Sequence, residues 1–170
     1  KRQQVVRDVQ SLAMARYGTN IDRRVISVVQ LTPDKVRHPT RSRPVLVGIR
    51  EEPDASRATV HVTLGWQSQE YVGSAYGPAA ASARLRLVGE ATLHALEALY
   101  PSGPPLALDA IGPAGMGMRT VVIAVVVSSV AVRGEEVAVG AALSQGGDLP
   151  ETAVRAVLDA LNRRLPSTAG

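Results

Sequence analysis

Few side chains in this 170-residue sequence are of the kinds that carry out catalysis. The chain has no cysteine, and its three histidines, His38, His61 and His94, are scattered along it. Thiolates and clustered histidines are the usual zinc ligands, so the sequence predicts no metal site. Four carboxylates lie beside predicted turns without a nucleophile-and-base pair near them, namely Asp109, Glu135, Glu136 and Asp148. We therefore expect neither enzymatic activity nor a cofactor.

A second kind of chemistry is indicated where glycine and alanine gather ahead of a helical pattern. The stretch "GSAYGPAAA" begins at Gly73 and leads from a strand-like segment into a long amphipathic pattern, with Pro78 suited to a first helical turn. Free N–H groups at a helix start can hold a carboxylate or phosphate. In the simpler interpretation, Gly73 and Gly77 only let the chain turn from strand to helix. This pattern alone leaves both interpretations open.

Three further features favour ordinary structural roles. The stretch "GPAGMGMR" at residues 112–119 fits no phosphate-binding fingerprint and precedes a strand, so we interpret it as a hairpin or rim loop. The basic residues between positions 32 and 43 are interpreted as a solvated linker, although they could contact phosphates. His94 lies between Glu90 and Glu97 on a helical pattern, which favours a surface ion pair over a catalytic role.

The composition predicts a folded chain with an aliphatic core. Hydrophobic residues make up 45% of the sequence, with no phenylalanine. The formal net charge is +4, with acidic residues beside most basic clusters, so charge alone does not identify a partner. The longest apolar run, at residues 121–132, is β-branched and too short to span a bilayer. Because no signal peptide is evident at Lys1, we expect a cytoplasmic protein without a membrane segment.

The periodicity of the chain predicts an order of elements. Residues 1–31 are expected to form a helix and a strand, and residues 32–43 an exposed linker. From residue 44 onward, three strand candidates and a helix are followed by three more strand candidates and a second helix. Asp148 followed by Glu151 resembles a capping box at the start of that second helix.

The two halves of this region repeat each other. Ala91 aligns with Ala156 and Ala95 with Ala160, which places Gly73 opposite Gly140. We therefore predict an α+β protein whose domain, residues 44–170, contains two tandem βββα units at 44–100 and 106–165. Each three-stranded layer has one apolar face, so the units must share a core or bind another chain.

These junctions resemble the C-terminal regulatory domain of 2-isopropylmalate synthase and citramalate synthase. Gly73, Gly77 and Pro78 fit that family's "G-x-G-x-G-P" pattern with Ala75 at the middle glycine, and "AVLDALN" after Gly140 is similar to its second unit. The resemblance covers residues 44–165. It implies a pseudo-symmetric homodimer that binds a branched-chain amino acid or similar end product. It implies no synthase chemistry, because the family's catalytic barrel of about 250 residues is longer than this sequence.

The resemblance also implies where a ligand binds. We expect a non-catalytic regulatory protein that binds a small carboxylate and couples occupancy to dimer geometry or to a partner protein. Backbone at the glycine junctions lines the expected site and three side chains shape it, with Tyr76 able to fill the pocket. The expected site residues are Gly73, Ala75, Tyr76, Gly77, Pro78, Gly140, Ala141 and Ala142.

Two alternatives of other classes remain open at this point. A nucleic-acid-binding module is suggested by a pI near 10.0 together with mixed helices and strands. Its binding would weaken steeply with salt. A purely structural oligomerisation module is suggested by β-branched strands and small-residue junctions, and no metabolite would change its thermal stability.

Overall fold

The computed structural model describes residues 14, 16, 43–130 and 134–162 of the chain. The predicted N-terminal helix and strand, nearly all of the predicted linker and the last residues of the second unit lie outside this part. The described residues from 43 onward form six strands and two helices, in the order β1 Val45–Asp54, β2 Arg57–Trp66, β3 Gln69–Pro78, α2 Ala81–Leu99, β4 Leu106–Met116, β5 Arg119–Val130, β6 Gly134–Leu143 and α3 Leu149–Leu161. The predicted α+β fold of two βββα units is confirmed.

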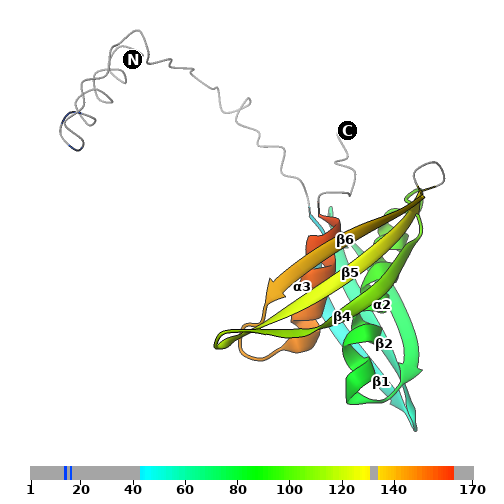
Figure 1. Ribbon diagram of the computed structural model, residues 1–170. Helices are drawn as coiled ribbons and strands as arrows, with labels where there is room; N and C mark the ends of the chain where they lie inside the picture. The colour runs from blue at the N-terminus through cyan, green and yellow to red at the C-terminus, as the bar shows by residue number, and fades with distance from the viewer. Residues whose placement is uncertain (1–13, 15, 17–42, 131–133, 163–170) are drawn as a thin grey trace. The chain divides into compact units, whose positions relative to one another are not determined.

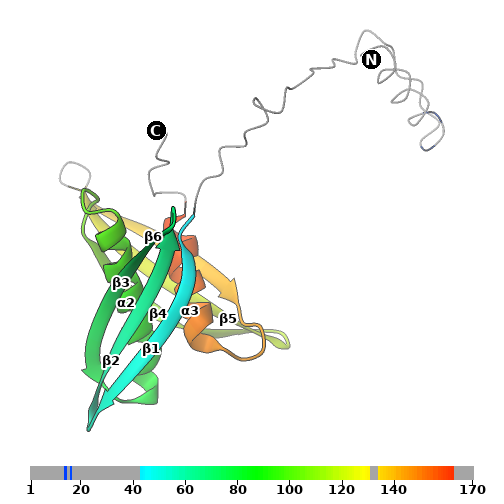
Figure 2. The same ribbon diagram turned by 180° about the vertical axis from the view of Figure 1, so that it is seen from behind.

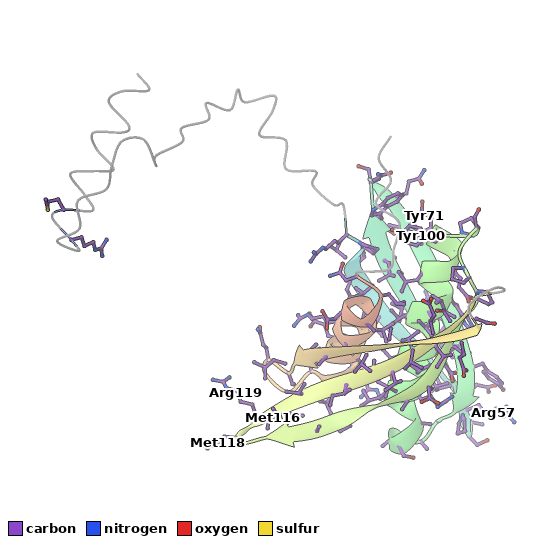
Figure 3. The ribbon with its side chains drawn as sticks, turned by 45° about the horizontal axis from the view of Figure 1, so that its top comes forward. Arg57, Tyr71, Tyr100, Met116, Met118 and Arg119 are labelled. Carbon is purple, nitrogen blue, oxygen red and sulfur yellow. The ribbon has the colours of Figure 1, made fainter. Side chains whose placement is uncertain are left out.

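Each unit forms its own antiparallel sheet from strands that follow one another in sequence. The orders are β1-β2-β3 and β4-β5-β6. Gln67 and Ser68, both with positive φ, form the tight turn between β2 and β3. At the β4–β5 hairpin, β4 extends to Met116, so the stretch interpreted as a loop is mostly strand and only two residues turn. Figure 3 shows Met116, Met118 and Arg119 at the tip of this hairpin.

The two helices lie between the two sheets. Figure 1 views the molecule with β4–β6 in front, Figure 2 views it from behind with β1–β3 in front, and the helices run between them. Helix α2 packs on β2 and β3 and also contacts β4 and α3. Helix α3 packs on β5 and β6 and also contacts β1. The aliphatic core therefore fills the space between the sheets. Neither of these helices is long and apolar enough to cross a membrane.

Helix α2 is more deeply buried than its sequence pattern predicts. The pattern indicated one apolar face and one solvated face, yet the helix also buries Gly89, Ala91 and Ala95. The reason is that α2 is covered from more than one side, by its own sheet, by β4 and by α3. A Cβ atom on Gly89 would come within 2.7 Å of Leu108 on β4. The small residues of α2 therefore allow two layers to approach it.

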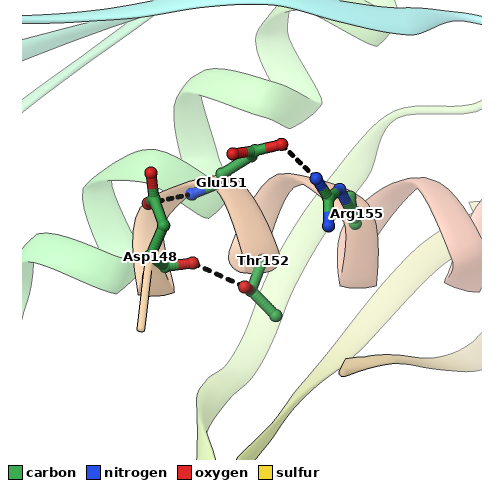
Figure 4. Close-up of polar contacts among 4 residues, drawn as sticks. All are labelled: Asp148, Glu151, Thr152 and Arg155. Atoms are coloured by element: carbon green, nitrogen blue, oxygen red, sulfur yellow. Dashed lines mark hydrogen bonds and ion pairs between the residues drawn. The ribbon is translucent and has the colours of Figure 1, made fainter. Parts of the chain in front are cut away.

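The helix α3 begins with a side-chain cap, as predicted. The Asp148 carboxylate accepts a hydrogen bond from the Glu151 N–H at 3.1 Å, and the Thr152 hydroxyl donates to the Asp148 carbonyl at 2.5 Å. Figure 4 shows these contacts and the ion pair between Glu151 and Arg155. The cap satisfies a backbone donor that would otherwise lack a partner.

Removing this cap gives a first test of the fold. In an Asp148→Ala variant we expect the free energy of unfolding to fall by about 1 kcal/mol, because the Glu151 N–H loses its acceptor. Chemical denaturation followed by circular dichroism measures the change. An Asp148→Asn variant is the matched control, since asparagine caps helices nearly as well as aspartate and keeps most of the stability.

Candidate functional site

The glycines predicted to form a turn before α2 lie instead inside strand β3. Gly73, Ala75 and Gly77 are buried and face the helix. A Cβ atom on Gly73 would run into the carbonyl oxygen of Ala91 and the nitrogen of Ala95, and one on Gly77 would lie 2.7 Å from Leu87. The strand-to-helix turn itself begins only after Pro78. At these two positions glycine therefore allows the helix to approach the sheet.

The second unit repeats this arrangement. Gly140 and Ala142 face inward from β6, whereas Ala141 is exposed and its N–H donates to the Asp159 carboxylate at 3.1 Å. A Cβ atom on Gly140 would run into the backbone of Ala156 and Ala160. These alanines are the partners that the sequence repeat assigns to Ala91 and Ala95. The expected site residues thus divide between two sheets, each glycine lying under its own helix.

Tyr76 lies on the opposite side of β3 from these glycines. Its side chain is 56% exposed, and the guanidinium carbon of Arg57 lies 5.2 Å from the centre of its ring. Neighbouring residues of a strand point to opposite faces, so Tyr76 cannot point to the same side as Gly77. The side chain is consequently part of the outer surface of the first sheet.

A cavity of about 370 Å³ lies beside Pro78, where β3 ends and α2 begins. We call it the α2 cavity. Its walls are mostly small or apolar side chains and come from β1, β2, β3 and the start of α2, namely Glu51, Pro53, Ala58, Val60, Pro78, Ala79, Ala80, Ala81, Arg84 and Leu87. The volume lies within the range of small-molecule sites. Of the expected site residues, only Pro78 is part of this lining.

The α2 cavity carries one charge of each sign. The Arg84 guanidinium donates from Nε to the Glu51 Oε1 atom at 2.7 Å. Arg84 lies in the first turn of α2, where the helix dipole disfavours a cation, and Glu51 compensates it. Because Glu51 is 33 residues away in the sequence, only the folded sheet brings the two together.

The start of α2 adds backbone donors to this cavity. Its N-cap residue, Ala80, has extended backbone angles and offers no side-chain cap, and the first turn of the helix holds no acidic residue. The first N–H groups of a helix lack intrahelical acceptors and attract negative charge. The cavity wall is therefore electropositive at its helical end and carries a carboxylate at Glu51.

Within the described part of the chain, no ionisable residue other than Glu51 and Arg84 lines the cavity. The expected ion pair of His94 is replaced by a hydrogen bond in which its Nδ1 donates to the Ser74 carbonyl at 2.7 Å. Burial, together with the neighbouring Tyr71, raises the pKa of the Tyr100 phenol above its ordinary value of 10.0 (Figure 3). The described residues contain no cluster of three or more side chains suited to holding a metal ion.

Comparison with known proteins does not identify a family for the chain. No model of a known protein family matches it, and no curated protein matches it either. What the structure shows is the fold alone, two βββα units of antiparallel sheet and helix.

Sequence reasoning did not find the charged residues of the α2 cavity. Neither Glu51 nor Arg84 was among the candidate residues predicted from the sequence. The one usable signal was the absence of Ser, Thr, Asp or Asn at the N-cap of α2, in contrast to Asp148 at the start of α3. A helix start without a capping side chain leaves its first N–H groups open to water or to a ligand.

Proposed function

We propose that this domain binds a small amino acid, or a closely related carboxylate, in the α2 cavity. The observation that carries the proposal is the cavity itself, with free helix donors and Arg84 on one side and Glu51 on the other. A binding protein of this kind would act as a regulatory module, with occupancy sensed by a second copy or a partner protein. The internal repeat and its resemblance to an amino-acid-sensing domain support this proposal.

The cavity offers complementary partners for each part of an amino acid. The ligand's carboxylate would accept from the N–H groups that begin α2 and from Arg84, an arrangement typical of anion sites at helix starts. Its ammonium group would donate to Glu51. An aliphatic side chain would be covered by Val60 and Leu87, and 370 Å³ is ample for a branched side chain.

The helix starts of the two units differ in a way that supports this assignment. At α3 the carboxylate that caps the helix is part of the chain, Asp148. At α2 the equivalent helix start has no acidic residue and faces a cavity. An external carboxylate in the α2 cavity would play at α2 the role that Asp148 plays at α3.

A binding role is favoured over catalysis by the chemistry of the lining. Of the residues lining the cavity, only Glu51 and Arg84 are ionisable, and they pair with each other. The described lining includes no serine, threonine or cysteine side chain. The pair is suited to orienting a zwitterion. The ligand's carboxylate would pair with Arg84 in place of Glu51, and its ammonium group would pair with Glu51 in place of Arg84.

A thermal-shift comparison of leucine with its 2-oxo acid tests the proposal. A ligand at 100 times its dissociation constant raises the free energy of unfolding by about 2.7 kcal/mol. We expect Arg84→Met to weaken binding of both compounds by about 10-fold or more, because a charged donor is lost. Glu51→Gln should weaken binding of leucine much more than that of the oxo acid, which has no ammonium group.

The control is Glu52→Gln, which alters the neighbouring carboxylate that contacts Arg50 and His61 on the outer face of the sheet. Each ligand-induced shift in melting temperature is measured against the same variant without ligand. Any stability that the variant loses with its ion pair therefore cancels in the comparison. If leucine, isoleucine, valine and their oxo acids all leave the melting temperature of the wild-type chain unchanged, the proposal is wrong.

A further inference from the structure

The outer face of the second sheet is apolar along three strands. In β5 the outward residues are Val121, Ile123, Val125 and Val127, because their neighbours Val122, Ala124 and Val126 are buried against the helices. On β6 the residues paired with them include Val137, Val139 and Leu143, which are 55%, 64% and 39% exposed. We call this surface the valine face.

The strand β4 continues this surface with small residues, and its bulge between Leu108 and Ala110 adds one exposed acidic residue, Asp109, on this edge strand. Its residues opposite the outward positions of β5 are Ala107, Ala110, Gly112 and Ala114. The face therefore has four rows across three strands, each occupied by an aliphatic side chain or glycine. A strand covered on only one face normally alternates apolar and polar residues, whereas one covered on both faces is continuously apolar. The sequence of β5 is of the second kind.

The equivalent face of the first sheet is mixed, with exposed Val45, Val47 and Val72 at one end and polar rows along the rest. One row across it holds Arg50, His61 and Ser74, and the next holds Glu52, Thr59 and Tyr76. The Arg50 and Glu52 side chains form an ion pair at 3.1 Å. Two sheets of the same architecture thus differ in what they expose. The valine face is therefore the stronger candidate for an interaction surface, since the largest apolar patch on a protein is often functional.

The size of the valine face fits a small two-sheet interface. With about 4.8 Å between strands and about 6.8 Å between alternate residues, four rows on three strands give a footprint of about 400 Å² before side-chain relief is counted. Two such faces packed together would bury roughly 1,000 Å² of accessible surface, the lower limit for a specific interface. Flat faces of two sheets pack in this way about 10 Å apart.

The charges at the two ends of the face favour a second copy of the chain as its cover. Arg119 is outward at the hairpin end of β5, and Glu135 is outward at the opposite end, on β6 beside Ser129. In a two-fold pair with antiparallel strands, Arg119 of one copy approaches Glu135 of the other, and the reverse holds by symmetry. On the central strand β5, the outward residues between these two ends carry no charge.

We infer that the valine face is the interface of a homodimer in which two second sheets pack face to face with their strands antiparallel. This inference uses a surface other than the α2 cavity and does not depend on a ligand. The dimer must form in the absence of any amino acid. Failure of ligand binding therefore leaves it standing, and failure of dimerisation leaves the cavity proposal standing.

Analytical ultracentrifugation of the full 170-residue chain tests the inference. We expect a mass of twice 17.9 kDa for the wild type. In Val139→Glu, a carboxylate placed in the apolar centre should raise the dimer dissociation constant by about 100-fold or more. The matched control is Val72→Glu, because Val72 precedes Gly73 as Val139 precedes Gly140 and is 54% exposed on the first sheet. This control should remain a dimer.

Charge reversal then tests the alignment of the two copies. Arg119→Glu alone should weaken the dimer, and combining it with Glu135→Arg should restore most of the lost affinity, because the pair is reversed but kept. A wild-type chain that is monomeric at all concentrations overturns the inference and assigns the cover to another segment or partner. A dimer that survives Val139→Glu overturns it as well, because its interface then lies elsewhere.

Discussion

Replacing Gly73 or Gly140 by alanine is expected to lower the free energy of unfolding by about 3 kcal/mol, or more. In both cases the added methyl group meets helix backbone, which cannot rotate away as a side chain could. Either the helix must move off its sheet or the strand must bend. The two substitutions should have similar effects, because the Gly73 contact with Ala91 and Ala95 recurs between Gly140 and its helix.

Thermal unfolding followed by circular dichroism measures this effect, with an expected fall in the melting temperature of about 10 °C. Gly48→Ala is the matched control, since a Cβ atom there meets nothing within 4 Å. It lies in the same sheet as Gly73, and alanine in a strand should be neutral or slightly stabilising. A Gly73→Ala protein as stable as the control would contradict the close approach of α2 to β3.

Introducing a cap at the start of α2 should both stabilise the protein and weaken ligand binding. An Ala80→Asp variant places a carboxylate where the N–H groups of α2 lack a side-chain acceptor, and the extended backbone of Ala80 suits a capping residue. We expect the free energy of unfolding to rise by about 1 kcal/mol. The internal carboxylate would then occupy the donors proposed for the ligand, so affinity for leucine should fall by about 100-fold.

The comparison with Ala80→Asn separates capping from charge repulsion. Asparagine caps a helix about as well as aspartate but brings no negative charge. If the helix donors bind the ligand, both variants lose affinity in isothermal titration calorimetry. An Ala80→Asp protein that gains stability and still binds leucine like the wild type would show that the ligand does not use the start of α2.

The repeat and the order of elements could be predicted because they depend on local sequence. Strand and helix periodicities lie within single segments, and the alignment of Gly73 with Gly140 needs only the matching alanines of the helices. The structure confirms that these residues pair in space, glycine against alanine in both units. The cap at Asp148 was predictable for the same reason, since its acceptor and donor are three residues apart.

The features that could not be predicted from the sequence depend on which elements meet in three dimensions. The glycines before α2 were open to interpretation as a turn because local sequence does not show that a helix crosses the strand at Gly73. The burial of Ala91 and Gly89 likewise depends on α2 being covered by more than one layer. The pairing of Glu51 with Arg84 depends on the position of β1 beside the start of α2. No periodic pattern contains that information.

The attachment of α2 to the second sheet makes the helix a mechanical link across the molecule. Arg86 donates to the Leu108 carbonyl at 3.2 Å, and Glu97 accepts from the Leu106 N–H at 3.0 Å, so α2 is tied to β4 near both of its ends. Close-packed protein interiors hardly compress, which means that a helix moved at one end must carry its neighbours with it. A displacement of the first turn of α2 would therefore also move strand β4, on the far side of the core.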